Sequence, residues 1–340
     1  MSARSKPVVF RAMLAAACVA LLAATASSSA RPAAPPAPAA TDVPDAAVSR
    51  TIRRALDYVY RSASNAANFR EHGDDYMWCF ATIAHTARDP ELAGAALAMG
   101  RERARQWRRE HRFVPPNATA DDVADLVYGA LGADRLGITD SRFKRQLRVA
   151  ARRFTASDYL RFDPAVGPPP EFGTFTDALI ATYSGDAYGI RLGAPYREVI
   201  RWLPHMRPYA PSGKAFSDTF YAVTHVVYTL NGYGAKRIAP RLLPAEVAFI
   251  RRGLALGIAR RDAEMVGEGL DTLKAFGFDG REPLVRRGIA LLVASQRPDG
   301  TWGGSRDVYT RYHSAWTGVD GLRSYRFGAE IRQLSEVPGA

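Results

Sequence analysis

The chain has 340 residues, of which 47% are hydrophobic, and 46 Lys and Arg against 34 Asp and Glu give a formal net charge of +12. This composition excludes a wholly disordered chain and a disulfide-rich scaffold, and it allows one large hydrophobic core. The excess of arginine favours attraction to an anionic partner or surface. We find no nucleic-acid-binding motif and expect no nucleic-acid partner.

Residues 1–30 have the order of a secretory signal peptide. Arg4, Lys6 and Arg11 form a basic start, and residues 13–26 form an apolar run. That run is short for a membrane span, and small residues up to Ala30 fit cleavage sites. We therefore expect an exported protein, periplasmic or secreted, with a net charge of +9 and no transmembrane segment once residues 1–30 are removed.

The expected mature chain begins with a linker. Residues 31–47 are rich in Pro and Ala, as disordered linkers are. Cys18 lies in a poor lipoprotein box, because the apolar run continues beyond it, so lipidation there is not expected. The folded domain is predicted at 48–335, where Cys79 alone remains and an intramolecular disulfide is impossible.

Helical periodicity dominates the predicted domain. Apolar residues at Ile52, Leu56, Val59 and Tyr60 predict a first helix from Val48. Pro and Gly clusters separate the helices that follow, which are predicted at 91–109, 120–132, 141–155, 174–184, 196–203, 217–231, 244–261, 262–276, 283–296 and 309–321.

Two aspartates lie between His72 and His85, after the first predicted helix. Asp74 and Asp75 lie in GDDYMWCF. Aspartate is a preferred residue at the start of a helix, so we expect them to cap the helix that follows.

The later helices repeat at intervals of 43–48 residues. TDALIATYSG, THVVYTLNGYG, GEGLDTLKAFG and YHSAWTGVDG can be superposed so that each has a polar second residue, and these residues are Asp177, His225, Glu268 and His313. Asp125, and more weakly Cys79, extend the series backwards. Paired helices at such a period form arrays of helical hairpins. We predict an all-α fold, an α/α toroid, whose inner helices point the polar series into one central cavity.

One loop carries a family resemblance. Residues 287–304, RGIALLVASQRPDGTWGG, resemble the QW repeat of squalene and oxidosqualene cyclases through Arg287, Gly288, Leu291, Leu292, Gln296, Gly300 and Trp302. The resemblance implies a member of the α/α-toroid superfamily, in which the Gln caps a neighbouring helix and the Trp stacks on the joint between repeats. The cyclase acid motif Asp-x-Asp-Asp has no counterpart, since TADDVAD at 119–125 lacks its spacing.

The next segment, SRDVYTRYHSAWTGVDGL, is similar to the β subunit of protein prenyltransferases. In that family a histidine behind an aromatic residue starts the last inner helix and binds zinc, and His313 matches it. The family's Asp-x-Cys pair is absent, because Glu268 and Asp271 come one repeat earlier without a cysteine. Its α-subunit partner is not expected for an exported chain.

The polar series suggests two kinds of chemistry. His225, His313, Glu268 and Asp177 are the candidate metal ligands, because imidazole and carboxylate groups suit Zn²⁺, Fe²⁺ or Mn²⁺. An open coordination position would activate water or polarise a substrate oxygen. Without a metal, Glu268 and Asp177 would act as acid and base. Tyr228 completes the candidate catalytic set and, with Tyr309, Tyr312 and Trp316, would form walls against a sugar ring.

The leading functional hypothesis is an exported, metal-assisted enzyme with a small-molecule or saccharide ligand in the central cavity. Three alternatives stay open. They are a metal-free lyase or hydrolase on an anionic saccharide, a terpene-cyclase-like or prenyltransferase-like protein, and an envelope module that binds a ligand without catalysis.

Overall fold

The computed structural model describes residues 43–210 and 213–333. The predicted signal peptide, Cys18 and residues 31–42 of the predicted linker lie outside the described residues. Within those ranges the fold is all-α, as predicted, and the strands are the two-residue β1 (Arg237–Ile238) and β2 (Glu330–Ile331), which pair in parallel. No helix in the described part combines the length and apolar character needed to cross a bilayer.

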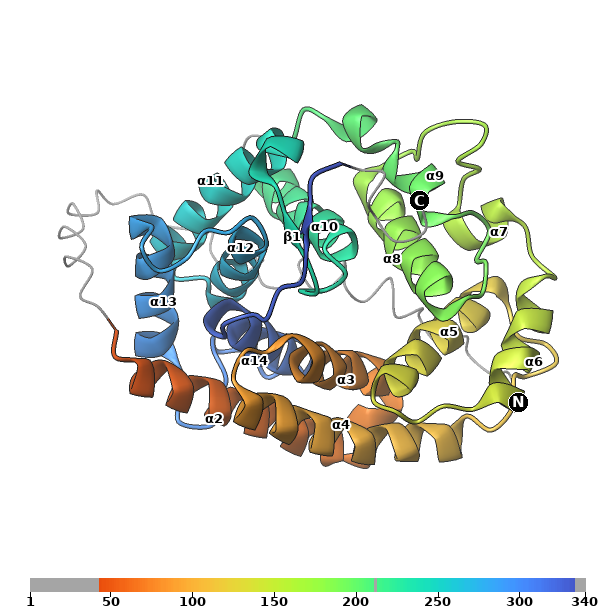
Figure 1. The fold of residues 1–340 in the computed structure, drawn as a ribbon, viewed down its shortest axis with the longest axis horizontal. Coiled ribbons are helices and arrows are strands. Elements are labelled where there is room, and N and C mark those ends of the chain that lie inside the picture. The colour runs from red at the N-terminus through yellow and green to blue at the C-terminus, as the bar shows by residue number, and fades with distance from the viewer. Residues whose placement is uncertain (1–42, 211–212, 334–340) are drawn as a thin grey trace, which may run out of the picture.

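The helices alternate between an inner and an outer position along the chain (Figure 1). Helices on the inside are α3 (Ala66–Thr86), α5 (Ala120–Arg135), α8 (Phe172–Tyr188), α10 (Gly213–Leu230), α12 (Ala263–Ala275) and α14 (Val308–Leu322). Helices on the outside are α2 (Asp45–Ser64), α4 (Pro90–Glu110), α6 (Ser141–Ala151), α7 (Ala156–Leu160), α9 (Tyr196–Ile200), α11 (Pro244–Arg260) and α13 (Pro283–Ser295). The 3₁₀ turns η2 (Leu203–Met206) and η3 (Pro240–Leu242) lie between them in the chain.

Each inner helix packs against the next. Helix α3 contacts α5, α5 contacts α8, and contacts continue through α10 and α12 to α14, which in turn contacts α3. A hydrogen bond joins the last inner helix to the first. The hydroxyl of Tyr312 in α14 donates to Asp75 Oδ2 in α3 at 2.8 Å. Both side chains are buried. A residue in the middle of α3 and one in α14 are therefore neighbours although they are 237 positions apart.

The sequence analysis did not predict helix α3. Its amino-terminal cap is Asn65, which accepts hydrogen bonds from the backbone N–H groups of residues 67 and 68. The backbone leaves helical geometry at His72 and resumes at Gly73, so poor helix formers interrupt the periodic pattern. Asp74 and Asp75, which were expected to cap a helix, lie within α3 directly after this kink and are buried.

Side-chain caps set the starts of the two helices that later form the site. The carboxylate of Asp262 accepts from the N–H of Met265 at the start of α12. Asp307 likewise accepts from the N–H of Thr310 at the start of α14. Because a cap satisfies N–H groups that the helix itself leaves without a partner, each aspartate stabilises the start of its helix.

Helices α12 and α14 share the most extensive contact between described helices. They approach closely because Gly267 has no side chain, and a Cβ atom there would lie 2.7 Å from the backbone oxygen of Thr317. The opposing atoms are backbone, which cannot move aside cheaply. Gly267 therefore determines the spacing of the two helices directly beside Glu268.

The loop that resembles a QW repeat ties α13 and α14 to α2. Gln296 donates from Nε2 to the backbone oxygen of Thr51 at 2.8 Å, and Trp302 donates from Nε1 to that of Leu292 at 2.8 Å. Gly300 has φ +97°, and a Cβ atom there would lie 2.2 Å from the Arg54 oxygen. Thr51 lies in the body of α2, so the Gln296 side chain joins the end of α13 to α2 and does not cap an end of α2.

We expect Gly267→Ala to lower the free energy of unfolding by about 1–3 kcal/mol, because the added methyl group must push α12 and α14 apart. The matched control is Gly94→Ala in the exposed interior of α4, where a Cβ atom meets nothing within 4 Å. That change is expected to raise stability by about 0.4–1 kcal/mol, since alanine favours a helix over glycine. Urea unfolding followed by circular dichroism measures both, and equal effects would contradict the close approach.

Candidate functional site

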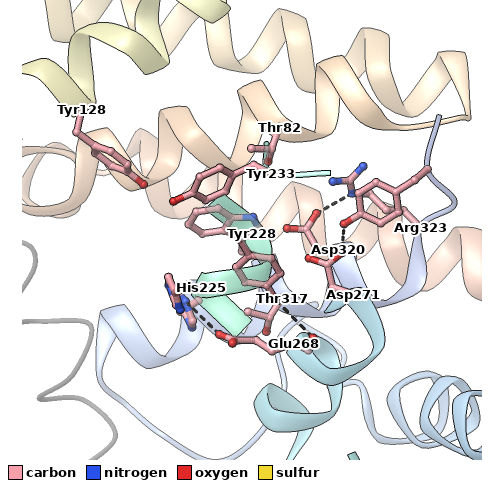
Figure 2. Close-up of a pocket in the computed structure, with 13 residues that line it drawn as sticks. Thr82, Tyr128, His225, Tyr228, Tyr233, Glu268, Asp271, Thr317, Asp320 and Arg323 are labelled. Atoms are coloured by element: carbon pink, nitrogen blue, oxygen red, sulfur yellow. Dashed lines mark hydrogen bonds and ion pairs between the residues drawn. The ribbon is translucent and has the colours of Figure 1, made fainter. Parts of the chain in front are cut away.

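A pocket of about 590 Å³ lies among the inner helices (Figure 2). This volume includes space that is open to solvent. Its walls carry carboxylates, histidines and aromatic rings together, and the lining residues are Thr82, Tyr128, His225, Tyr228, Tyr233, Glu268, Asp271, His313, Trp316, Thr317, Asp320, Arg323 and Tyr325. They come from α3, α5, α10, α12 and α14 and from the segments that follow α10 and α14.

The centre of the site is a group made by Glu264, Glu268 and His313. The two glutamates are four residues apart in α12 and so share one helix face. His313, in α14, places Nδ1 2.7 Å from Glu264 Oε1 and Nε2 4.0 Å from Glu268 Oε1. One ligand atom from each residue lies within 4.8 Å of the others, so this buried group could hold a metal ion.

Burial determines the protonation of Glu268. The side chain is 1% exposed, and burial raises its pKa from 4.5 to about 8, although His313 and a hydrogen bond from Thr224 favour the charged form. The Thr224 hydroxyl donates to Glu268 Oε2 at 2.5 Å. Near neutral pH, and without a metal, Glu268 is therefore mainly the protonated acid.

His313, unlike Glu268, is mainly in its charged form near neutral pH. Burial alone would lower its pKa, but the hydrogen bond and the charge of Glu264 outweigh burial and raise the pKa to about 9. The imidazole also stacks on Tyr309, with ring centroids 5.1 Å apart. His313 and Glu264 consequently form a partly buried ion pair near neutral pH.

His225 is the neutral imidazole of the pocket. Its Nδ1 lies 2.7 Å from the backbone oxygen of Tyr221 in the preceding turn of α10. A carbonyl oxygen only accepts, so Nδ1 carries the proton and Nε2 keeps a free lone pair. Burial lowers the pKa of His225 to about 4. His225 and Glu268 both line the pocket (Figure 2).

A second polar group forms the other end of the pocket (Figure 2). Arg323 Nε lies 2.6 Å from Asp320 Oδ1, and Arg323 Nη1 donates to Thr86 Oγ1 at 2.8 Å. The Tyr325 hydroxyl donates to Asp271. Burial and the nearby charge of Asp320 raise the pKa of Asp271 to about 7. Each of these carboxylates thus has a partner that offsets the cost of burying it.

Aromatic rings join the two polar ends. Tyr228 and Tyr233 lie between them in Figure 2, with ring centroids 6.3 Å apart and ring planes inclined by 29°. Burial raises the pKa of Tyr228 well above 10, so it remains a protonated phenol. Its hydroxyl is 3.5 Å from the backbone oxygen of Glu268, which is a marginal hydrogen-bond distance.

The structure brings four of the five residues selected from the sequence to one pocket. Glu268, His313, His225 and Tyr228 line it, while Asp177, half-buried on α8, does not. His225 and Asp177 are also outside the group that could hold a metal. The sequence analysis missed Glu264, although its spacing of four residues from Glu268 in a predicted helix was a usable signal.

Two further members of the predicted polar series also lie away from the pocket walls. Asp125 in α5 is partly buried, and desolvation of its carboxyl group raises its pKa well above 3.8. Cys79 in α3 is a buried free thiol whose pKa is raised by burial. Neither residue lines the pocket described above.

Comparison with protein families, with curated proteins and with solved structures finds no match for this chain.

We expect metal-free wild type to lose stability relative to Glu268→Gln as the pH rises from about 4.5 to about 8. The folded-state pKa lies above the unfolded one, so the folded state holds this proton longer and unfolding becomes easier as the pH rises through that window. The expected difference is roughly 1–3 kcal/mol. Urea unfolding across this range with a chelator present measures it.

The control for this measurement is Glu171→Gln, which makes the same change at an exposed position before α8. Its stability curve should run parallel to that of the wild type. A parallel curve for Glu268→Gln as well would mean that the carboxyl group of Glu268 is solvated in solution.

Proposed function

We propose that the protein is a metal-assisted enzyme whose active site is this pocket. The observation that carries the proposal is the convergence of Glu264, Glu268 and His313, of which Glu268 and His313 are buried and line the pocket. Isolated buried carboxylates are costly, and their concentration beside two histidines in a cavity is typical of functional sites. Zn²⁺, Fe²⁺ and Mn²⁺ all accept this mixture of ligands.

The residues divide into binding and reacting roles in this proposal. Glu264, Glu268 and His313 hold the metal, which would supply a Lewis acid or an activated water. His225 is suited to accept a proton, because it is neutral and its Nε2 is free. Tyr228 and Trp316 form walls for a ring-shaped substrate, and the pair of Asp320 and Arg323 orients its far end. The proposed substrate is a small molecule or a single sugar that contacts these lining residues.

The proposed overall architecture is an α/α toroid that carries the site in its centre. Support comes from the alternation of inner and outer helices and from the contact of α14 with α3, which closes the series. Residues 287–304 also have the contacts of a loop that joins successive repeats. Export to the periplasm or medium remains part of the proposal and rests on residues 1–30 of the sequence alone.

A metal titration tests the proposed function directly. Chelator-treated wild type should bind one Zn²⁺, Fe²⁺ or Mn²⁺ per chain, and Glu268→Gln or His313→Ala should weaken binding at least about 100-fold, since even outer partners of metal sites contribute 10–100-fold. Asp177→Asn is the matched control, because it removes one carboxylate outside the pocket wall. Full metal retention by both site variants, or no binding by wild type, contradicts the metal site.

The same titration has a pH signature. Glu268 and His313 are protonated near neutral pH and must release their protons to bind a metal. Affinity should therefore fall as the pH drops below about 8, by up to about 100-fold per pH unit. Calorimetry in buffers of different ionisation enthalpy counts the protons released, and a count of zero would show that these two groups are not ligands.

Ring closure has its own test. The hydrogen bond between Tyr312 and Asp75 joins α14 to α3, so Tyr312→Phe and Asp75→Asn should be coupled in a double-mutant cycle by about 0.5–3 kcal/mol. Urea unfolding of the four proteins gives this coupling. Strict additivity would place the two side chains apart and would oppose the toroid.

A second candidate function needs no metal. The pKa values of Glu268 and His225 are displaced in opposite directions, to about 8 and about 4, as in pairs that serve as general acid and general base. This arrangement suits a hydrolase or lyase acting on a sugar. It is favoured if the wild type binds no metal yet cleaves aryl glycosides or uronate polymers in a chelator, with loss of that activity in Glu268→Gln.

A further inference from the structure

Helix α6 has an unusual charge pattern. Residues 141–153, SRFKRQLRVAARR, contain six basic residues and no acidic one. The helix lies on the outside of the molecule, at the right edge of Figure 1, and none of its residues lines the pocket. The function proposed above uses none of these residues.

The helix separates its two faces sharply. Phe143, Leu147, Ala150 and Ala151 are buried against the rest of the protein. Arg142, Arg145, Arg148 and Arg152 are exposed. Their spacing of three or four residues places the arginines along one stripe of the helix, opposite the buried residues.

The arginines of this stripe are available for an external partner. Among the described residues none of the four forms an ion pair. The acid nearest in sequence, Asp140, caps α6 and pairs with Arg108 at 2.6 Å. Arg153, just beyond α6, is engaged by the backbone oxygens of Pro116 and Ala118.

Two apolar side chains project from the same region. Val149 is 69% exposed and lies seven residues after Arg142, on the same side of α6. Phe113 is 61% exposed, and the Arg142 guanidinium lies 5.8 Å from the centre of its ring. In the described ranges only Val166 is a further large hydrophobic residue with comparable exposure.

We propose that this basic face, made by Arg142, Arg145, Arg148 and Arg152 with Phe113 and Val149, binds the surface of an anionic lipid bilayer. Arginines near such a surface are attracted to the headgroups, and the exposed apolar tips can enter the boundary between headgroups and acyl chains. A strand of nucleic acid would match the charges but would leave Val149 without an apolar environment. Binding here holds the protein on the membrane surface and does not involve the pocket.

Sedimentation with vesicles tests the proposal. The full chain should bind vesicles of phosphatidylcholine and phosphatidylglycerol, and should bind vesicles of phosphatidylcholine alone far less. Each arginine near an anionic surface contributes about five-fold in affinity, so the triple variant Arg142→Gln, Arg145→Gln, Arg148→Gln should bind about 100-fold more weakly. The double variant Phe113→Ser, Val149→Ser should lose about ten-fold and keep the dependence on salt.

The matched control removes three exposed arginines from the opposite side of Figure 1, with Arg50→Gln and Arg54→Gln in α2 and Arg287→Gln in α13. It changes net charge equally and should bind nearly as the wild type does. Equal losses in both triple variants would reduce the effect to net charge and overturn the proposal. Equal binding to both kinds of vesicle would overturn it, and so would binding of RNA or duplex DNA without binding of vesicles. Circular dichroism confirms that each variant keeps its helices.

Discussion

The close approach of α12 and α14 is the constraint on which the site depends. Gly267 lets the two backbones meet at Thr317. The next residue of α12 is Glu268, and His313 lies one turn before Thr317 in α14. If the helices were one side chain further apart, His313 could not contact Glu264 at 2.7 Å and still lie 4.0 Å from Glu268. The close contact at Gly267, which affects stability, therefore also sets the distances between His313 and the two glutamates.

The pocket keeps ionisable groups in a place where charge is expensive. Burial raises the pKa of Glu268 and of Asp271 and lowers that of His225. Every such displacement costs folding free energy at a pH where the solvated group would be charged. A protein that only needed a packed core would do better with apolar residues of similar volume. In the proposed function, the chemistry of the site uses these groups, with or without a metal.

Charge differs between the inside and the outside of this molecule. The pocket exposes Glu268, Asp271 and Asp320 to a ligand and offers Arg323 as the permanent cation. The chain as a whole has a net charge of +12. The lining has three carboxyl groups and one arginine, so the excess of basic residues lies outside the pocket and is an argument for an external anionic surface. A bound divalent cation would change that balance inside the pocket.

The local spacing of apolar residues was enough to predict most of the secondary structure. Apolar periodicity and Pro or Gly breaks predicted most of the helices, because both depend on neighbours within one or two turns. Helix α3 was not predicted because its apolar pattern is interrupted at His72 and Gly73. The membership of Glu268 and His313 in one polar series was also visible, since equivalent positions in a repeat face the same way.

The partners within the site were decided by tertiary structure. Asp177 shares its place in the repeat with Glu268, yet it does not line the pocket, whereas Glu264, outside the series, contacts His313. Repeat position determines the side of a helix on which a residue lies, and it leaves open how closely two helices pack and how they are displaced along their axes. The sequence by itself determined an all-α chain with acids and histidines on recurring helix faces. Only the packing of α12 against α14, set by backbone contact at Gly267, decided which of those carboxylates meets the histidine.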